Sequence, residues 1–230
     1  MITQAIILAG GLGTRLRSAV PDLPKCMAPV AGKPFIDHVI NYFFDQGISS
    51  FVFALGYMNE VIIDHIKNQY PDLDARYSIE TELLGTGGAI RLACGHTSEE
   101  NVLVLNGDSI LKIDLEALST LHSKVNAECT LALKPMTDFE RYGVVETDQQ
   151  NRITSFKEKQ FYSEGLINGG IYAVHVPSFI DMPLTGKFSF EKDYLEAYYP
   201  SGKIYGQIQD EYFIDIGIPE DFARAQEDFK

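Results

Sequence analysis

The chain has 230 residues, of which 45% are hydrophobic, and a formal net charge of −13. This length suits one large α/β domain, and we predict a single domain with a first half over about residues 1–125 and a second half over about 126–230. The negative charge argues against nucleic-acid or anionic-membrane partners, because phosphate groups would be repelled on average. A phosphate ligand must therefore meet a local basic site.

The cysteines and the N-terminus indicate a compartment. Cys26, Cys94 and Cys129 are widely spaced, which indicates neither a disulfide framework nor a zinc site. The N-terminus lacks the pattern of a signal peptide, and no apolar run approaches the roughly 18 residues of a membrane helix. We therefore expect a cytoplasmic protein with no membrane partner.

Short apolar runs alternate with helical patterns in the first half. We predict strands at 4–9, 51–55 and 101–105 and helices at 34–46 and 59–69. This alternation is typical of βαβ units and a largely parallel sheet. The strand runs are almost entirely apolar, as expected for central strands covered by helices on both faces.

The first apolar run leads into the loop Gly10-Gly11-Leu12-Gly13-Thr14-Arg15, with Pro24-Lys25 just beyond it. Glycines lack a Cβ and tolerate positive φ, so consecutive backbone N–H groups can converge on phosphate oxygens. Arg15 and Lys25 add positive charge. No Gly-Lys pair is followed by the Ser or Thr of a Walker loop, and Leu16 stands where a dinucleotide fingerprint has its third glycine. A tight turn without a ligand is the alternative.

A second glycine-rich stretch, Gly85-Thr86-Gly87-Gly88, follows Glu80 and Glu82 and is predicted to open a short helix. Its backbone can approach a flat ring. A carboxylate can accept hydrogen bonds from both N1–H and the 2-amino group of guanine, whereas uracil and cytosine offer no such pair of donors. The acids therefore favour guanine, with glutamates that simply lie at a helix entrance as the alternative.

Two aspartates follow predicted strands. Asn106-Gly107-Asp108 stands where the strand at 102–105 ends, and open parallel sheets place ligand-facing residues there. Asp215 follows the aromatic run Tyr212-Phe213-Ile214 in the same order. Two carboxylates with substrate phosphates and waters are a usual ligand set for Mg²⁺, so both aspartates are candidate ligands. A helix cap or turn is the alternative for either one alone.

The second half has shorter predicted strands, at 129–133, 143–146, 153–156, 167–173 and 203–207. Residues 148–151 predict a hairpin turn, and Pro219 with the acids that follow it predicts the start of a final helix. We expect this half to form a smaller lobe of mixed or antiparallel pairing that packs against the first.

Several signatures in order along the chain resemble the sugar-phosphate nucleotidyltransferase family. They are Leu8-Ala9-Gly10-Gly11-Leu12-Gly13-Thr14-Arg15-Leu16 with Pro24-Lys25, Leu84-Gly85-Thr86-Gly87-Gly88-Ala89, Asn106-Gly107-Asp108, Tyr142-Gly143-Val144-Val145, Glu158-Lys159 and Asn168-Gly169-Gly170. The resemblance runs from residue 2 to about residue 225. It implies a three-layer, Rossmann-like α/β fold with a mixed, mostly parallel central sheet, a nucleotide-binding first half and a smaller sugar-binding lobe.

The resemblance also implies a role for each matching residue. Arg15 and Lys25 are implied to stabilise charge at the reacting phosphorus, and Asp108 and Asp215 to hold Mg²⁺. The residues implied to contact the nucleotide are Leu8, Ala9, Gly10, Gly11, Gly13, Thr14, Glu80, Gly85, Thr86 and Asn106. Those implied to contact the sugar phosphate are Gly143, Glu158, Lys159 and Asn168.

Within the family, residues 25–30, 138–143, 165–172, 187–191 and 212–221 resemble guanylyltransferases that act on D-glycero-α-D-manno-heptose 1-phosphate. The implied substrates are GTP and this sugar phosphate, the implied product serves bacterial surface glycans, and the protein is expected to be a monomer or homodimer. Cys26 departs from the pattern, since proline often follows the lysine, and we expect no nucleophilic role for it.

Two kinds of alternative function stay open. One is another sugar 1-phosphate nucleotidyltransferase, for mannose 1-phosphate with GTP or for an amino-sugar phosphate with UTP. The other is a catalytically silent regulatory homologue, against which the joint presence of Arg15, Lys25, Asp108 and Asp215 argues.

Overall fold

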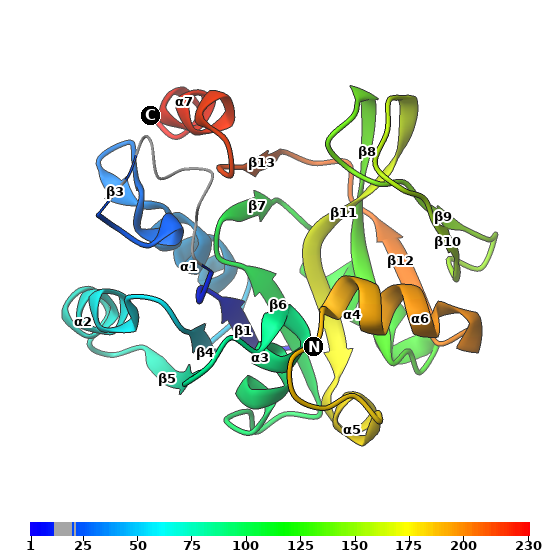
Figure 1. Cartoon of the computed structure of the whole chain (residues 1–230), viewed down its shortest axis with the longest axis horizontal. Coiled ribbons are helices and arrows are strands. Elements are labelled where there is room, and N and C mark those ends of the chain that lie inside the picture. Colours follow the sequence, from blue (N-terminus) through cyan, green and yellow to red (C-terminus); the bar gives the residue numbers. More distant parts are fainter. Residues whose placement is uncertain (12–19, 21) are drawn as a thin grey trace.

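The computed structural model describes residues 1–11, 20 and 22–230 (Figure 1). Its core is a seven-stranded sheet in the order β12-β8-β11-β6-β1-β4-β5. The strands are β1 (Gln4–Leu8), β4 (Ser50–Leu55), β5 (Asp74–Ile79), β6 (Asn101–Asn106), β8 (Cys129–Phe139), β11 (Tyr162–His175) and β12 (Ile204–Ile208). Only β11 runs antiparallel to its neighbours in this sheet. The predicted mixed, mostly parallel sheet is confirmed.

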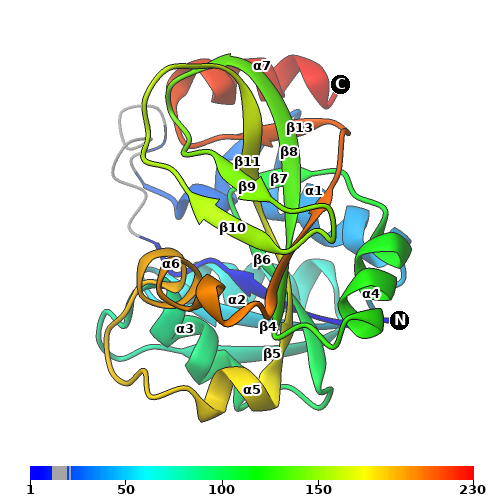
Figure 2. The same cartoon turned by 90° about the vertical axis from the view of Figure 1, so that its right-hand side faces the viewer.

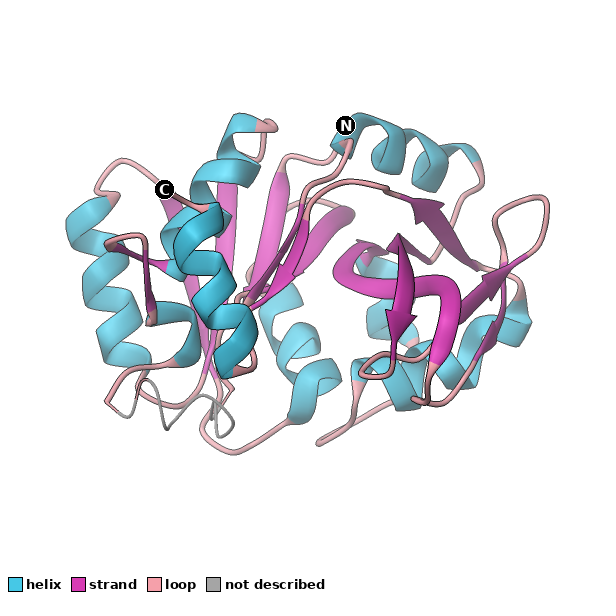
Figure 3. Ribbon diagram, turned by 90° about the horizontal axis from the view of Figure 1, so that it is seen from above, coloured by secondary structure: helices cyan, strands magenta, loops and turns pink. Residues whose placement is uncertain are grey.

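Helices cover both faces of the sheet, which gives three layers (Figure 3). Alternate strand residues enter different cores: Ile7 and Phe53 face one core, and Ile6 and Val52 the other. The helices on the first face are α1 (Phe35–Asp45), α2 (Asn59–Gln69), α4 (Leu115–Lys124) and α7 (Pro219–Asp228). Those on the second are α3 (Gly85–Cys94), α5 (Val176–Asp181), the π-helix η2 (Phe190–Leu195) and α6 (Glu196–Tyr198).

Local chemistry explains where several helices begin and end. α1 begins after Pro34 and is followed by Gly47, whose φ of 98° is accessible to glycine at little cost. α4 begins after Asp114, whose carboxylate accepts a hydrogen bond from the backbone N–H of Ala117. None of the helices in the described part of the chain has the length and hydropathy needed to span a bilayer.

Three strands of the second half, β8, β11 and β12, extend the sheet of the first half rather than form a sheet of their own. Both β8 and β11 are longer than the predicted runs at 129–133 and 167–173. Their outer parts pair with each other, and Phe139 and Ile167 there form a small buried cluster with Val144. β9 (Val145–Thr147) and β10 (Ile153–Phe156) form a hairpin beside these outer parts (Figure 2). The predicted turn is confirmed: Asp148 accepts hydrogen bonds from the backbone of Gln150 and Arg152.

Short elements complete the fold near the carboxyl ends of the first-half strands. They are the 3₁₀ turn η1 (Lys25–Met27), the pair β2 (Pro29–Val30) with β3 (Lys33–Pro34), and the pair β7 (Ser109–Leu111) with β13 (Phe213–Asp215). The 3₁₀ turn η3 (Tyr199–Ser201) lies elsewhere, between α6 and β12, where the Tyr199 ring packs on Phe156 of β10. The helix predicted after Pro219 is confirmed as α7. Gln226 fastens it to the β2–β3 hairpin, since its amide donates to the Pro29 carbonyl and its oxygen accepts from the Ala31 N–H.

Candidate active site

The carboxyl ends of β1, β4, β5 and β6 gather at one edge of the sheet. The chain passes from β1 to β4 and β5 on one side and returns to β6 on the other, so the order reverses between β1 and β6. Open α/β sheets bind ligands at such a point. Gly107 N–H donates to the Leu8 carbonyl at 2.9 Å, which brings the loops after β1 and β6 together. A cavity of about 940 Å³ lies here, and we call it the strand-end cavity.

Lys25 lies between two carboxylates in the strand-end cavity. Its Nζ is 2.6 Å from Asp108 Oδ2 and 3.3 Å from Asp215 Oδ1. Asp215 reaches this position because β13 pairs with β7, which aligns it with Ser109, and because Ile216 N–H donates to the Asp108 carbonyl. The predicted acids therefore converge with the predicted cation, although they come from distant parts of the chain.

The η1 turn holds Lys25 in place. Cys26 and Met27 are buried behind the turn, and Met27 N–H donates to the Pro24 carbonyl at 2.8 Å. The Lys25 side chain is only 16% exposed, so its charge is poorly screened by water. Burial, and secondly the charge of Asp108, raise the pKa of the Cys26 thiol to about 12. The thiol therefore stays protonated at neutral pH.

Asp108 and Asp215 are suitable ligands for a divalent cation. Both carboxylates turn toward a single positive charge, and carboxylate oxygens are the donors that Mg²⁺ prefers. Among residues 1–11, 20 and 22–230, no group of three or more His, Cys, Asp or Glu side chains could hold a metal ion. A magnesium ion here would therefore need further oxygens from substrate phosphates and water.

Glu80 lies where the base of a nucleotide is predicted to bind. It follows β5 and lines the strand-end cavity, and its Oε2 accepts a hydrogen bond from Leu84 N–H at 3.1 Å. Its Oε1 lies against Gly56, where an added Cβ would be 2.6 Å away, and close to Gly10. Three strand ends thus fix this carboxylate in position, whereas Glu82 is exposed.

The second glycine-rich stretch opens α3, as predicted, and Gly85 and Thr86 line the strand-end cavity. Gly85 and Gly87 are required because another segment of the chain, at Phe188, passes close to their backbone. Gly85 has a φ of 70°, and a Cβ there would lie 2.6 Å from the Phe188 carbonyl oxygen. A Cβ on Gly87 would overlap the Phe188 ring. The sequence did not reveal this partner.

On the sugar side the structure separates the predicted residues. Lys159 lines the strand-end cavity, but Gly143, Glu158 and Asn168 are not among its lining residues. Gly143 lies against the Lys157 carbonyl. Asn168 lies behind Glu191, since its Nδ2 is 3.4 Å from Glu191 Oε1, and Glu191 is the residue at the cavity wall.

Sequence reasoning missed four charged or aromatic residues at the cavity wall: Arg141, Tyr142, Lys187 and Glu191. Arg141 is held by Asp221 at 2.7 Å and by the Tyr142 hydroxyl at 2.8 Å, so its guanidinium links the β8–β9 loop to α7. All four lie within stretches quoted for the guanylyltransferase resemblance, but their spacing alone marks no ligand site.

The remaining predicted nucleotide residues divide by position. Leu8, Ala9, Gly10, Gly11 and Asn106 line the strand-end cavity. Gly13, Thr14 and Arg15 lie outside the described residues, so their predicted roles stay predictions.

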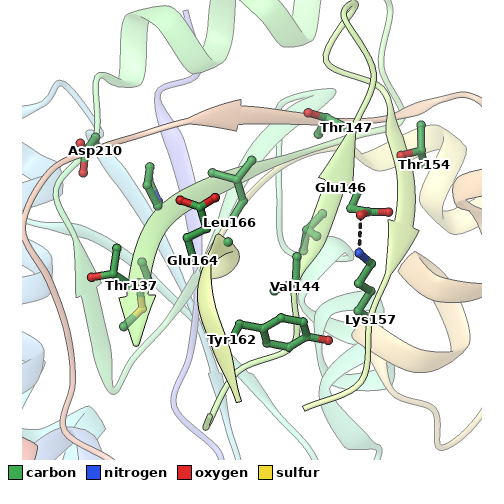
Figure 4. Close-up of a pocket in the computed structure, with 14 residues that line it drawn as sticks. Thr137, Val144, Glu146, Thr147, Thr154, Lys157, Tyr162, Glu164, Leu166 and Asp210 are labelled. Carbon is green, nitrogen blue, oxygen red and sulfur yellow. Dashed lines mark ion pairs between the residues drawn. The ribbon is translucent and has the colours of Figure 1, made fainter. Parts of the chain in front are cut away.

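A second cavity, of about 950 Å³, lies between the outer parts of β8 and β11 and the β9–β10 hairpin (Figure 4). We call it the hairpin cavity. Glu146 and Lys157 form an ion pair on its hairpin side, while Glu164 and Leu166 of β11 lie opposite them. The Tyr162 ring also lines it. No residue predicted from the sequence to bind a substrate lines this cavity.

Comparison with known proteins agrees with the strand-end geometry. A model of the nucleotidyl transferase family matches residues 4–230. The chain is 48% identical over 227 residues to D-glycero-α-D-manno-heptose 1-phosphate guanylyltransferase of Aneurinibacillus thermoaerophilus, which covers 99% of this chain and 98% of that protein. It is also 48% identical over 219 residues to the protein of the same name from Campylobacter jejuni, covering 95% and 96% of the two chains.

A solved structure agrees with these sequence comparisons. HddC from Yersinia pseudotuberculosis, crystallised in complex with GMP-PN, matches with a TM-score of 0.87 and 37% identity over 100% of both chains. The similarity therefore extends over both halves of the sheet and over every element that lines the strand-end cavity. The chain belongs to the nucleotidyl transferase family.

Proposed function

We propose that this protein transfers GMP from GTP to D-glycero-α-D-manno-heptose 1-phosphate, giving GDP-D-glycero-α-D-manno-heptose and pyrophosphate. The observation that carries the proposal is Lys25 between Asp108 and Asp215 at the point where the strand order reverses. The relatives that are 48% identical along nearly their whole length bear this substrate in their names.

The reaction needs charge control more than proton transfer. A phosphate oxygen of the sugar 1-phosphate is already anionic, so it can attack the α-phosphorus of GTP in line without a general base. The site must bring two anions together and stabilise charge as pyrophosphate leaves. In this proposal Lys25 serves the α-phosphate, with Arg15 as its predicted partner. Lys159, Lys187 and Arg141 supply positive charge elsewhere on the cavity wall.

We propose Asp108 and Asp215 as the residues that hold Mg²⁺. When bound, the ion neutralises phosphate charge and orients the triphosphate. The two aspartates also hold the Lys25 ammonium, so a mixed cluster of cations and carboxylates would meet the triphosphate.

For the base, we propose that Glu80 accepts hydrogen bonds from N1–H and the 2-amino group of guanine. Leu84 N–H occupies one acceptor position of Oε2, and each carboxylate oxygen can accept more than one hydrogen bond. The fixed orientation of this carboxylate favours recognition of a rigid donor pair. We also propose that the reaction takes place in the cytoplasm, where GTP is available, and that the product serves bacterial surface glycans.

The test is release of pyrophosphate in the presence of Mg²⁺. GTP, ATP, CTP, UTP and dTTP are each combined with D-glycero-α-D-manno-heptose 1-phosphate, mannose 1-phosphate and glucose 1-phosphate. We expect turnover only with GTP and the heptose phosphate. Turnover with another pair would retain the nucleotidyl transfer and reject the substrate assignment, and no turnover with any pair would favour a silent homologue.

A further inference from the structure

Residues 186–191 cross the N-terminal end of α3, and we call them the crossing segment. Two backbone hydrogen bonds join it to the glycine-rich stretch: Phe188 N–H donates to the Leu84 carbonyl and Gly87 N–H donates to the Phe188 carbonyl, both at 3.0 Å. A third bond comes from a side chain, because Phe190 N–H donates to Thr86 Oγ1 at 2.9 Å. The base-side stretch and the crossing segment therefore form one hydrogen-bonded unit.

The Phe188 ring packs in the core beneath this hydrogen-bonded unit. It is 7% exposed, belongs to the core under the second face of the sheet, and lies so close to Gly87 that any added Cβ would overlap it. Gly88 makes a similar approach, because a Cβ there would lie 2.7 Å from the Gly186 carbonyl oxygen. Glycine at these positions thus permits the crossing segment to pass directly over the helix.

Residues on either side of Phe188 belong to the cavity, although Phe188 itself does not line it. Lys187 and Glu191 of the crossing segment line the strand-end cavity, as do Gly85 and Thr86 of the stretch beneath it. Glu191 is also steadied by Asn168, whose Nδ2 bonds to the Tyr172 hydroxyl at 2.9 Å. One buried ring therefore supports two parts of the cavity wall: the base-side part with Gly85 and Thr86, and the part that carries Lys187 and Glu191.

We propose that Phe188 is a positioning residue that fixes these two walls relative to each other, so that Glu191 and Lys187 meet the sugar phosphate while Gly85 and Thr86 meet the nucleotide. This inference rests on the proposed function for the identity of the two substrates. Its physical basis is that a misplacement of about 1 Å in a substrate-binding group can cost on the order of 10²-fold in rate. Phe188 touches neither substrate, and it acts through the crossing segment.

The test is a double-mutant cycle of Gly87→Ala, Phe188→Ala and the pair of substitutions, with KM measured for both substrates. We expect each single variant to raise both KM values by about 10-fold or more, because both walls move. In the Phe188→Ala background, Gly87→Ala should change either KM by less than about threefold, because the ring that the new Cβ would overlap is gone. Effects that simply multiply, or a change in only one KM, would overturn the proposal.

Controls separate positioning from loss of stability. Phe43→Ala removes a ring of equal type from the core on the other face of the sheet, and Gly95→Ala adds a methyl group just beyond the opposite end of α3. Both should leave the two KM values unchanged at a temperature where the variants are folded. Phe188→Leu, which retains much of the apolar contact, should restore both KM values to within about threefold of the wild type. If Phe188→Ala does not fold, Phe188→Val takes its place in the cycle.

The substrate panel on the wild type comes first, which keeps the two proposals distinguishable. If another sugar phosphate or nucleotide is used, the cycle is run with that pair, and it tests positioning although the substrate assignment has failed. If no pair is used, the cycle is run on GTP affinity by calorimetry, where the same lack of additivity is expected. A wild type that neither turns over nor binds GTP would overturn both proposals.

Discussion

The strand-end cavity and the hairpin cavity have nearly the same volume, about 940 and about 950 Å³, yet they are built differently. Each contains a lysine paired with a carboxylate: Lys25 with Asp108 in the first, and Lys157 with Glu146 in the second. Lys25 is 16% exposed, whereas Lys157 is 46% exposed. Charges that are partly removed from water interact more strongly with a ligand than exposed ones do. Volume alone therefore does not identify the active site.

The origin of the lining residues differs as well. The residues that line the strand-end cavity come from segments spread between Leu8 and Ile218. Several of them follow the carboxyl ends of parallel strands, which lie at the same edge of the sheet. Apart from Asp210, the residues that line the hairpin cavity all come from one stretch of the chain, between Pro135 and Leu166, and its β8–β11 wall is an antiparallel pair. Reactive side chains therefore gather where the topology brings distant segments of the chain together. Matched substitutions in the two cavities test this difference between them.

The largest expected effect is that of Asp108→Asn. Losing this carboxylate removes a proposed magnesium ligand and one partner of Lys25, so we expect kcat to fall by about 10³-fold, by analogy with loss of a group that stabilises the transition state. Glu146→Gln is the matched change in the hairpin cavity and should leave kcat within about twofold of the wild type, as expected for an exposed ion pair. Steady-state pyrophosphate release measures both, and equal losses would refute the distinction between the cavities.

Lys25→Met should cost about 10²-fold in kcat, because it removes a cation at the reacting phosphate but leaves both aspartates in place. Lys157→Met, in the hairpin cavity, is the control, with near-normal kcat expected. Circular dichroism confirms that each variant is folded. A Lys25→Met protein with more than about a third of wild-type kcat would exclude this lysine from the chemistry.

Glu80→Gln should affect selectivity more than rate. Glutamine can keep the bond from Leu84 N–H but not two acceptors toward guanine, so the preference for GTP over ATP should fall by about 10- to 100-fold. The ratio of kcat/KM for the two nucleotides measures this. Two control variants should not alter the ratio: Glu164→Gln in the hairpin cavity, and Glu82→Gln at an exposed position near Glu80. A changed ratio in either control would indicate that the guanine base binds near that residue instead.

The smallest effect on turnover at neutral pH is expected from His122→Gln, because His122 lies in neither cavity. Burial, and secondly the nearby His175, lower the pKa of His122 from 6.5 to about 4. As the pH falls, the unfolded chain takes up a proton first, so stability is full above about pH 6.5 and declines toward pH 4, by on the order of 3 kcal/mol.

Chemical denaturation between pH 7 and pH 4 tests this. The His122→Gln variant should lose less stability on acidification than the wild type, whereas His96→Gln, at an exposed position, should behave like the wild type. If His122→Gln shows the full acid sensitivity, another group is responsible. The result also separates two causes of a decline in turnover at acidic pH: unfolding of the protein, and titration of groups in the cavities.

The sequence predicted much of the first half because local signals and the fold agree there. The helix at 59–69 matches α2 at both ends, and β1, β4 and β6 differ from their predictions by one residue at one end. Asp108 and Asp215 were predicted to act together from their places after strands, and they do converge on Lys25. The ends of these strands can be predicted because each apolar run stops at the edge of the sheet where the strand-end cavity begins.

The sugar side was less predictable because its contacts are tertiary. The sequence around Gly87 does not indicate its contact with Phe188. The sequence around Asn168 does not indicate that Glu191 lies between it and the cavity. Arg141 gains its place through Asp221, a residue that the sequence explained only as part of a helix start. The positions of such residues depend on contacts between segments that are distant in the sequence, and hydrophobic periodicity carries no information about these contacts.

The placement of β11 between β6 and β8 has a consequence for synthesis of the protein. Until residues 162–175 have left the ribosome, the free edge of β6 and its apolar run lack the partner they have in the finished sheet. Unpaired apolar edges recruit other strands, so the nascent chain is most prone to aggregate during this interval. Ribosomes that pause before β11 should therefore lower the yield of native enzyme without any change in the stability of the folded form.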